Sequence, residues 1–241
     1  MRGINKLLDS FGYSLYKKSF HEKKYIEKRD FRPLEQLFYR HLHPDFYFVQ
    51  IGANDGVSFD PIYELVMREQ LRGIALEPLP DIFLKLQENY AGNPRVELVN
   101  AAIHKNEKQL PIYRVDPKAG GLPEWVKGIG SFNKDHHKLS QIDSGLIITE
   151  TVQCMSLPEL IDSYAISHID LLQIDTEGYD CEIIAMIDFS VMKPGIISFE
   201  HGIHDGIMSY EGYQHCQRLL MDQGYEIMTL KRDAIAYLRN W

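Results

Sequence analysis

The sequence predicts an α/β protein built on a mainly parallel β-sheet. From residue 46 onward, short apolar runs alternate with amphipathic stretches, which is the order of strands and helices in parallel sheets covered on both faces. The last two apolar runs are joined only by "KRD", which is too short for a crossover helix. The sheet should therefore include an antiparallel hairpin made by the last two strands. A length of 241 residues suits one sizeable domain with an extension.

Each element follows from local spacing along the chain. In the N-terminal part, apolar residues recur on one face of two short helices, at Ile4, Leu7, Leu8 and Phe11 and again at Leu34, Leu37, Phe38 and Leu42. Apolar runs typical of strands lie at 46–51, 73–78, 95–103, 110–115, 169–175, 195–201, 225–230 and 234–238. Amphipathic stretches lie between them at 60–71, 81–90, 151–164, 179–189 and 213–223.

Residues 116–149 interrupt this alternation. The segment is rich in Gly, Pro, Lys and His and shows no clean period. A loop of that length inside a compact domain is usually a lid or a binding element, and the alternative is a surface insertion without a role. We therefore divide the chain into a helical N-terminal extension, residues 1–43, and a domain over residues 44–241 that carries a lid at 116–149.

The composition argues against several classes of protein. The net charge of −8 disfavours a nucleic-acid binder, because phosphate binding needs a Lys/Arg surface. The first 40 residues carry ten Lys or Arg against five acids, which favours a solvated helical face over a membrane patch, and these helices also offer a surface for an oligomer. No apolar run approaches the length of a transmembrane segment, and three scattered Cys residues without a CxxC pair are typical of reduced thiols. We predict a cytoplasmic protein.

Candidate ligand-binding residues follow the predicted strands, at the edge where open parallel sheets bind ligands. After the first strand, "GANDG" places two glycines around a polar turn, ahead of a helix whose N-terminal amides favour anionic groups. Glu77 follows the second strand, where a carboxylate is placed to accept hydrogen bonds from both hydroxyls of a ribose. Small residues after the third strand are suited to flank a flat base. The predicted cofactor residues are Gly52, Asn54, Asp55, Gly56, Glu77, Pro78, Asn100, Ala101 and Asp175.

Acidic groups follow the fourth and fifth of these strands. Asp175 and Glu177 lie in "QIDTEGYD", and Glu200 and His201 lie in "SFEHG". Asp175 and Glu177 would also suit the cap and first turn of a helix, a role compatible with catalysis. Because the two strands should be neighbours, we expect the side chains to converge at one point.

The ligand that these residues predict is S-adenosylmethionine. "GANDGV" lacks the third glycine of the dinucleotide fingerprint, and the chain has no G-x-x-x-x-G-K-[ST] loop for a nucleoside triphosphate. S-adenosylmethionine has an amino-acid head and no phosphate, which suits a polar glycine turn followed by Glu77. Two other interpretations stay open, an NAD-type oxidoreductase on a Rossmann sheet and a non-catalytic module that keeps the pocket as a scaffold.

The order "VQIGANDG", "IALEPLP", "VNAAI", "SLPELI", "LLQIDTEGYDCEII" and "ISFEH" resembles the FkbM-type methyltransferases, a family of S-adenosylmethionine-dependent O-methyltransferases. The match covers roughly residues 46–202. The resemblance implies the class I methyltransferase sandwich, a Rossmann-like fold whose seven-stranded sheet has a reversed final strand. It also implies a small-molecule or glycan acceptor, with a hydroxyl on a sugar, glycan or natural product.

The resemblance also assigns roles to residues. It implies that Gly52, Asn54 and Gly56 form the cofactor loop, that Glu77 binds the ribose, and that Asp175 and Glu177 lie where cofactor meets substrate. Two positions depart from the family's pattern. Gln50 stands where such enzymes often have an acid, and Gln173 stands where they often have Lys.

Two routes remain for removing the proton of the acceptor hydroxyl. In one, His201 or a lid histidine such as His136 or His137 is the general base. In the other, a divalent ion, Mg²⁺ or Mn²⁺, is held by Asp175, Glu200 and His201 and acidifies the bound hydroxyl. The predicted catalytic residues are therefore His201, Asp175 and Glu177, and the predicted metal ligands are Asp175, Glu200 and His201.

Overall fold

The structure is a computed structural model that describes residues 32–239 and 241. The predicted helix at Ile4–Phe11 lies outside these residues. The second predicted N-terminal helix is present as α3 (Pro33–His41), and its apolar face, Leu34, Leu37 and Phe38, is buried. No helix among residues 32–239 is both long enough and apolar enough to cross a membrane.

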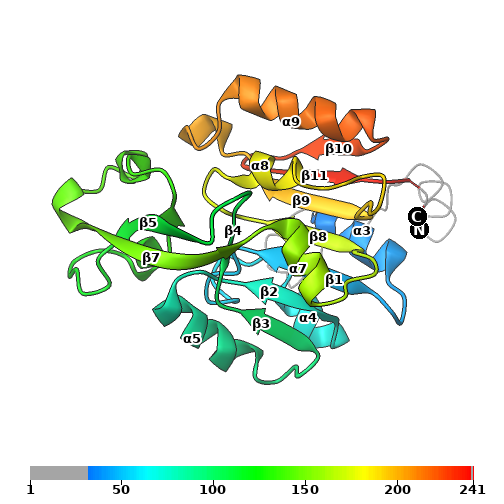
Figure 1. The fold of residues 1–241 in the computed structure, drawn as a ribbon, viewed down its shortest axis with the longest axis horizontal. Coiled ribbons are helices and arrows are strands. Elements are labelled where there is room, and N and C mark those ends of the chain that lie inside the picture. The colour runs from blue at the N-terminus through cyan, green and yellow to red at the C-terminus, as the bar shows by residue number, and fades with distance from the viewer. Residues whose placement is uncertain (1–31, 240) are drawn as a thin grey trace, which may run out of the picture.

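The main sheet has seven strands in the order β10-β11-β9-β8-β1-β2-β3 (Figure 1). All neighbouring strands are parallel except β11, which runs antiparallel to both β9 and β10. The predicted mainly parallel sheet and its hairpin are therefore confirmed. The strands are β1 (Tyr47–Ile51), β2 (Arg72–Leu76), β3 (Val96–Val99), β8 (Leu171–Ile174), β9 (Ile196–Glu200), β10 (Glu226–Thr229) and β11 (Asp233–Tyr237).

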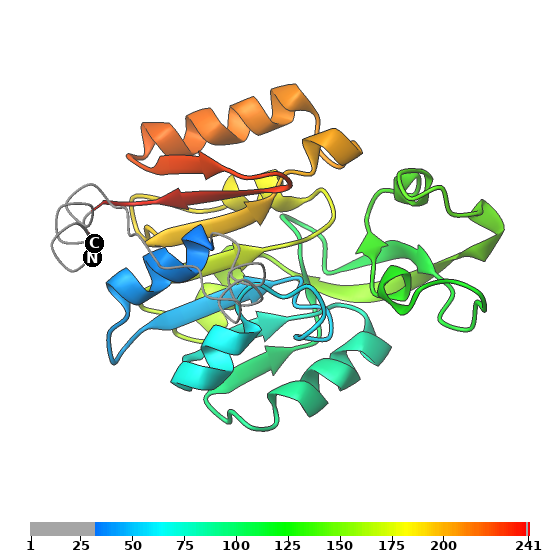
Figure 2. The same cartoon turned by 180° about the vertical axis from the view of Figure 1, so that it is seen from behind.

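Helices cover both faces of this sheet (Figures 1 and 2). Side chains alternate between the faces along each strand, so Val49 and Ile51 pack into one core while Phe48 packs into the other. The first core includes residues of α7 (Leu157–Ser163), α8 (Asp180–Ile184) and α9 (Tyr210–Asp222). The second includes residues of α3, α4 (Tyr63–Glu69) and α5 (Pro80–Tyr90).

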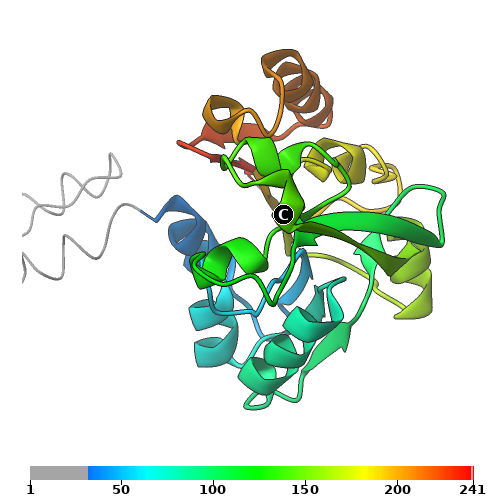
Figure 3. The ribbon, with the colours of Figure 1, turned by 90° about the vertical axis from the view of Figure 1, so that its left-hand side faces the viewer.

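A second, four-stranded sheet of order β4-β7-β5-β6 projects to one side of this core (Figures 1 and 2), and in Figure 3 it faces the viewer. We call residues 109–155 the β-arm. Its centre is the antiparallel pair of β5 (Gln109–Val115) and β7 (Ile147–Met155), and β4 (Ala102–Ile103) joins it to the main domain. The run at 110–115 thus belongs to this arm and not to the parallel sheet. Between β5 and β7 lie α6 (Glu124–Lys127), β6 (Gly130–Ser131) and the short helices η1 (His136–Lys138) and η2 (Ser144–Leu146).

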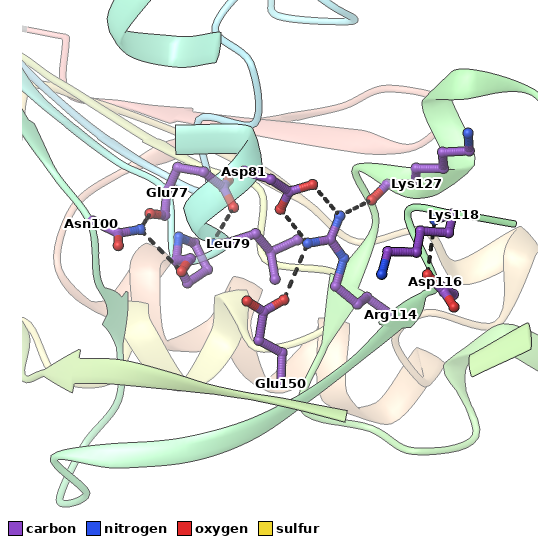
Figure 4. A network of polar contacts seen from close by, with 10 residues as sticks. Glu77, Leu79, Asp81, Asn100, Arg114, Asp116, Lys118, Lys127 and Glu150 are labelled. Carbon is purple, nitrogen blue, oxygen red and sulfur yellow. Dashed lines mark hydrogen bonds and ion pairs between the residues drawn. The ribbon is translucent and has the colours of Figure 1, made fainter. Parts of the chain in front are cut away.

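The β-arm is fixed to the main domain by the buried guanidinium of Arg114 (Figure 4). Arg114 forms ion pairs with Asp81, in the first turn of α5, and with Glu150 on β7, where its Nη1 lies 3.2 Å from Oε2. Its Nη2 also donates to the backbone carbonyl of Lys127, 2.8 Å away. The two carboxylates neutralise this buried charge, and together with the carbonyl they hold β5, β7, α5 and α6 in one arrangement through the two Nη atoms.

Candidate active site

A cleft opens where β1, β2 and β8 end and the β-arm crosses the sheet edge. It encloses about 660 Å³ of empty space, open solvent included. Seven predicted site residues line it, together with residues of the β-arm that sequence reasoning did not assign to the site. The predicted residues are Gly52, Asn54, Glu77, Pro78, Ala101, Asp175 and Glu177. The residues from the β-arm are Ile112, Gly128, Gly130 and Phe132.

Gly52 allows the first loop to pass the end of β8. Its φ is +79°, and a Cβ there would lie 1.8 Å from the carbonyl oxygen of Asp175. No side chain fits in that space, so the position requires glycine. Its N–H and that of Ala53 both donate to the carbonyl of Leu76, which binds the loop to the end of β2.

Glu77 is a buried carboxylate that organises the cleft wall. Its Oε2 accepts from the N–H of Asn54 and its Oε1 from the N–H of Leu79, each at 2.9 Å. Burial raises the pKa of Glu77 to about 7, although these two hydrogen bonds and the charge of Arg114 act in the opposite direction. Each carboxylate oxygen accepts more than one hydrogen bond, so Glu77 keeps acceptor capacity for a ligand in the cleft.

Three predicted cofactor residues lie behind the cleft wall rather than on it. The Asp55 carboxylate accepts from the N–H groups of Val57 and Ser58 and so stabilises the turn. The Asn100 amide donates to the carbonyls of Glu77 and Pro78 and fixes the loop that follows β2. Gly56 faces α5 instead of the cleft, because a Cβ there would lie 2.6 Å from the side chains of Leu86 and Tyr90.

The departures noted at Gln50 and Gln173 also lie away from the cleft. Gln50 is buried and donates from Nε2 to Asp60, 2.7 Å away, beneath the first loop. Burial raises the pKa of Asp60 to about 6. Gln173 is its register partner on β8 and is also buried. Both amides therefore belong to the packing under the loop.

Asp175, Glu177 and Glu200 form a cluster of three carboxylates at the ends of β8 and β9. One oxygen of each lies within 4.8 Å of the others. Asp175 faces the cleft, and its pKa is raised by desolvation and then by the charges of Glu200 and Glu177. The side chain of Asp175 is exposed to water in the open cleft, which reduces the desolvation of its carboxylate, but the repulsion between the three carboxylates remains. Burial, and then Glu177, raise the pKa of Glu200 to about 8.

Glu200 is the buried member of the cluster and has one free oxygen. Its Oε1 accepts from Nη2 of Arg232 at 2.9 Å. Its Oε2 is buried and has no hydrogen-bond partner among the described residues. An unpaired buried carboxylate oxygen is costly, and a cation or proton between the carboxylates would remove that cost. Arg232, from the β10–β11 turn, was missed by the sequence reasoning, although the predicted hairpin contained it.

His201 does not join this cluster, which corrects its predicted roles as base and metal ligand. Its ring is buried against Tyr213, with 4.7 Å between the ring centres. Its Nε2 lies 3.2 Å from the carbonyl oxygen of Leu230, and its Nδ1 accepts from the N–H of Ile203. Both ring nitrogens are thus used by the backbone. Glu177 occupies the third position that was predicted for His201.

The β-arm instead brings His136 to the cluster. Nε2 of His136 lies 3.1 Å from Oε2 of Glu177. Ser131 on β6 donates its hydroxyl to the backbone carbonyl of Glu177 at 3.0 Å. Glu177 has a φ of +53°, a backbone conformation that non-glycine residues rarely adopt, and these two contacts hold it. His137 turns away, with Nδ1 2.9 Å from the carbonyl oxygen of Lys134.

The carboxylate cluster fits a hard divalent cation. Its ligand atoms are all carboxylate oxygens, the type that Mg²⁺ and Mn²⁺ prefer, and Oε2 of Glu200 has no hydrogen-bond partner within the described part of the chain. Asp180 supports the cluster from behind, because its carboxylate accepts from the N–H groups of Thr176 and Glu200 and so ties the ends of β8 and β9 together. Burial raises the pKa of Asp180 to about 6.

Comparison with known proteins gives one family. The model of the methyltransferase FkbM domain matches residues 50–227. Among solved structures, a precorrin-6y C5,15-methyltransferase from Geobacter metallireducens GS-15 is 16% identical, with 86% of this chain and 87% of that chain covered and a TM-score of 0.45. A TehB-like SAM-dependent methyltransferase from Corynebacterium glutamicum is 10% identical, with 90% and 97% covered and a TM-score of 0.42. Aeropyrum pernix fibrillarin with natively bound S-adenosyl-L-methionine is 12% identical, with 85% and 73% covered and a TM-score of 0.39. No curated protein matches the chain.

Proposed function

This chain belongs to the FkbM methyltransferase family, and from that premise we propose that its S-adenosylmethionine-dependent methyl transfer goes to oxygen, on a hydroxyl of a sugar, glycan or natural product. The observation that carries the proposal is the carboxylate cluster beside the cleft, with the unpaired Oε2 of Glu200. Membership of a methyltransferase family replaces the oxidoreductase interpretation. A non-catalytic module would leave the cluster without a purpose.

The cleft residues support one direction for the cofactor. The loop at Gly52 and the end of β8 at Asp175 would hold the amino-acid head, and Glu77 would accept from the ribose hydroxyls with its remaining lone pairs. In this direction the methyl group would lie near Asp175 and Glu177. The acceptor would then enter beside the carboxylate cluster.

The chain's own residues would align the acceptor and manage its proton. When bound, S-adenosylmethionine supplies the methyl group, whose bond to sulfur breaks with the electron pair left on sulfur as the acceptor oxygen forms its bond to the methyl carbon. This displacement is in line, so positioning of the hydroxyl contributes much of the rate. With no ion bound, the hydroxyl proton would leave to Glu177 or to water, and His136, which contacts Glu177, would stabilise its charge.

We further propose that Asp175, Glu177 and Glu200 hold a divalent ion, Mg²⁺ or Mn²⁺. When bound, such an ion would lower the pKa of an acceptor hydroxyl. Its positive charge would offset the repulsion between the three carboxylates, and Arg232 would continue to balance part of the charge of Glu200. Without an ion, Glu177 would accept the proton of the acceptor hydroxyl, supported by its contact with His136.

The test is transfer of a labelled methyl group. The protein is incubated with [methyl-³H]S-adenosylmethionine, Mg²⁺ and a panel of free sugars, nucleotide sugars, glycans and polyketide alcohols, and the labelled product is identified by mass spectrometry. We expect a methyl ether on one of these hydroxyls. Label found only on nitrogen, carbon or sulfur of an acceptor would refute the O-methyl assignment while leaving the methyltransferase intact.

A further inference from the structure

Part of the cleft, which we call the slot, is lined by apolar side chains from both the main domain and the β-arm. The main domain contributes Leu79, Ala102 and Ile103, and the β-arm contributes Ile112 and Phe132. Leu79, Ala102 and Ile112 belong to one hydrophobic cluster, against which Phe132 packs. Neither half makes the slot alone, so the β-arm is a wall of the ligand site and not only a cover for the acceptor.

We propose that the segment Gly128–Phe132 of the β-arm forms the adenine wall of the S-adenosylmethionine pocket, with Phe132 as the aromatic contact of the base. The inference rests on the proposed placement of the ribose at Glu77. With the amino-acid head toward Asp175, the base would lie toward Leu79 and Ala102, which come after β2 and β3 and belong to the apolar part of the cleft lining. A flat, largely apolar base is the part of the cofactor that such a slot fits.

Two glycines set the width of the slot. A Cβ on Gly128 would lie 2.8 Å from the side-chain amide of Asn54, so the backbone of the β-arm closely approaches the cofactor loop. A Cβ on Gly130 would lie 3.2 Å from Leu79 and 3.4 Å from Ile112. Larger side chains at these positions would fill the space between the two halves. The glycines therefore keep the slot open while the β-arm closes one side of it.

The ring of Phe132 is held in place by two other rings. Tyr179 meets it edge to face, with 5.4 Å between centres and 86° between planes, and His104 does so at 5.7 Å and 81°. The neighbouring residue Ser131 donates to the carbonyl of Glu177. The base contact and the support of Glu177 thus come from adjacent residues, so seating the base also seats the segment that holds Glu177.

The test uses 5′-methylthioadenosine, which has the base and ribose but no amino-acid head, and S-adenosylhomocysteine, which has all three. Isothermal titration calorimetry is run on the wild type, on Phe132→Ala and on Phe132→Leu. Loss of base–aromatic stacking should weaken both ligands by a similar factor, roughly fivefold to 150-fold in Phe132→Ala. Phe132→Leu keeps the apolar bulk, so it should melt like the wild type and still bind both ligands more weakly.

Ile148→Ala is the matched control, because it removes an exposed apolar side chain from the same β-arm. It should leave both affinities unchanged. Unchanged binding in Phe132→Leu and Phe132→Ala, or a loss for S-adenosylhomocysteine alone, would overturn the inference and leave the proposed function standing. If the wild type and Glu77→Ala bind S-adenosylhomocysteine with equal affinity, the ribose does not lie at Glu77, and the inference that rests on this placement is wrong.

Discussion

His136 of the β-arm and Glu177 of the loop after β8 face each other, with 3.1 Å between Nε2 and Oε2. The contact joins the inserted sheet to the carboxylate cluster. Because Glu177 also has its backbone carbonyl bound by Ser131, the β-arm holds this residue at both its side chain and its main chain.

We expect His136→Ala to slow methyl transfer by roughly 10-fold to 150-fold, because the variant removes a hydrogen bond to the charged carboxylate of Glu177, and such bonds contribute roughly 1.5–3 kcal/mol. The affinity for S-adenosylmethionine should stay the same. Rates are measured with the acceptor found in the labelling screen. His137→Ala is the control, since its ring contacts only the carbonyl of Lys134 among the contacts described. If both variants lose the same factor in rate, the cause is a general disturbance of the β-arm and not the loss of the contact between His136 and Glu177.

Glu77→Ala should weaken S-adenosylmethionine binding at least about tenfold. Hydrogen bonds to a charged group contribute roughly 1.5–3 kcal/mol each, so losing both ribose contacts exceeds that factor. Calorimetry measures the affinity, and a thermal melt reports on the fold, which also loses the bonds to Asn54 and Leu79. An unchanged affinity would show that the ribose lies elsewhere.

The affinity for S-adenosylmethionine should fall as the pH is lowered from about 8 to 6. The folded-state pKa of Glu77 is about 7, above its ordinary 4.5, so the residue takes up a proton in this range and loses acceptor capacity. The sign for stability is opposite. Between pH 4.5 and 7 the folded protein binds more protons at Glu77 than the unfolded chain, so this residue's contribution to stability declines as the pH rises. Calorimetry and chemical unfolding at several pH values, on wild type and Glu77→Ala, separate the two trends.

EDTA should abolish methyl transfer, and added Mg²⁺ or Mn²⁺ should restore it. Asp175→Asn and Glu200→Gln should each lose Mn²⁺ binding, measured by electron paramagnetic resonance, because each removes a charged oxygen ligand. Glu211→Gln changes an exposed carboxylate in the first turn of α9 that does not belong to the cluster, and it should bind Mn²⁺ as the wild type does. If EDTA leaves the rate unchanged, no metal is required, and Glu177 with His136 accepts the hydroxyl proton.

Gly56→Ala should lower the free energy of unfolding by roughly 1–3 kcal/mol, the usual cost of overpacking. The sequence pattern predicted a contact with the cofactor at this position, but the structure places Gly56 against Leu86 and Tyr90. Its φ of +79° adds strain for any other residue. A denaturant titration measures the loss. Full stability combined with lost cofactor binding would restore the original interpretation.

Much of the sheet and part of the cleft could be predicted from the sequence. The apolar runs predicted the succession of strands and helices along the chain, and the rule that parallel strands end at one edge brought Glu77, Asp175 and Glu200 to the same side. The predicted place of His201 in the carboxylate cluster was wrong for a simple reason. Successive residues at the end of a strand point in opposite directions, so Glu200 and His201 could not both reach the cluster.

The β-arm could not be predicted in this way. Residues 116–149 show no period, and the pairing of Ile112 with Glu150 depends on contacts distant in sequence. A lid that covered only the acceptor could be removed without loss of cofactor affinity. Because Gly128, Gly130 and Phe132 line the cleft, removing residues 120–140 should weaken cofactor binding as well.

The position of β11 has a consequence for how the protein is made. It follows all other strands in the chain, yet it lies inside the sheet between β9 and β10. Until residues 233–237 have left the ribosome, β9 and β10 both present an unpaired edge, and the apolar residues Ala234–Ala236 that fill the core are missing. Open edges of this kind pair with other chains, so we expect the nascent protein at this stage to be prone to aggregation.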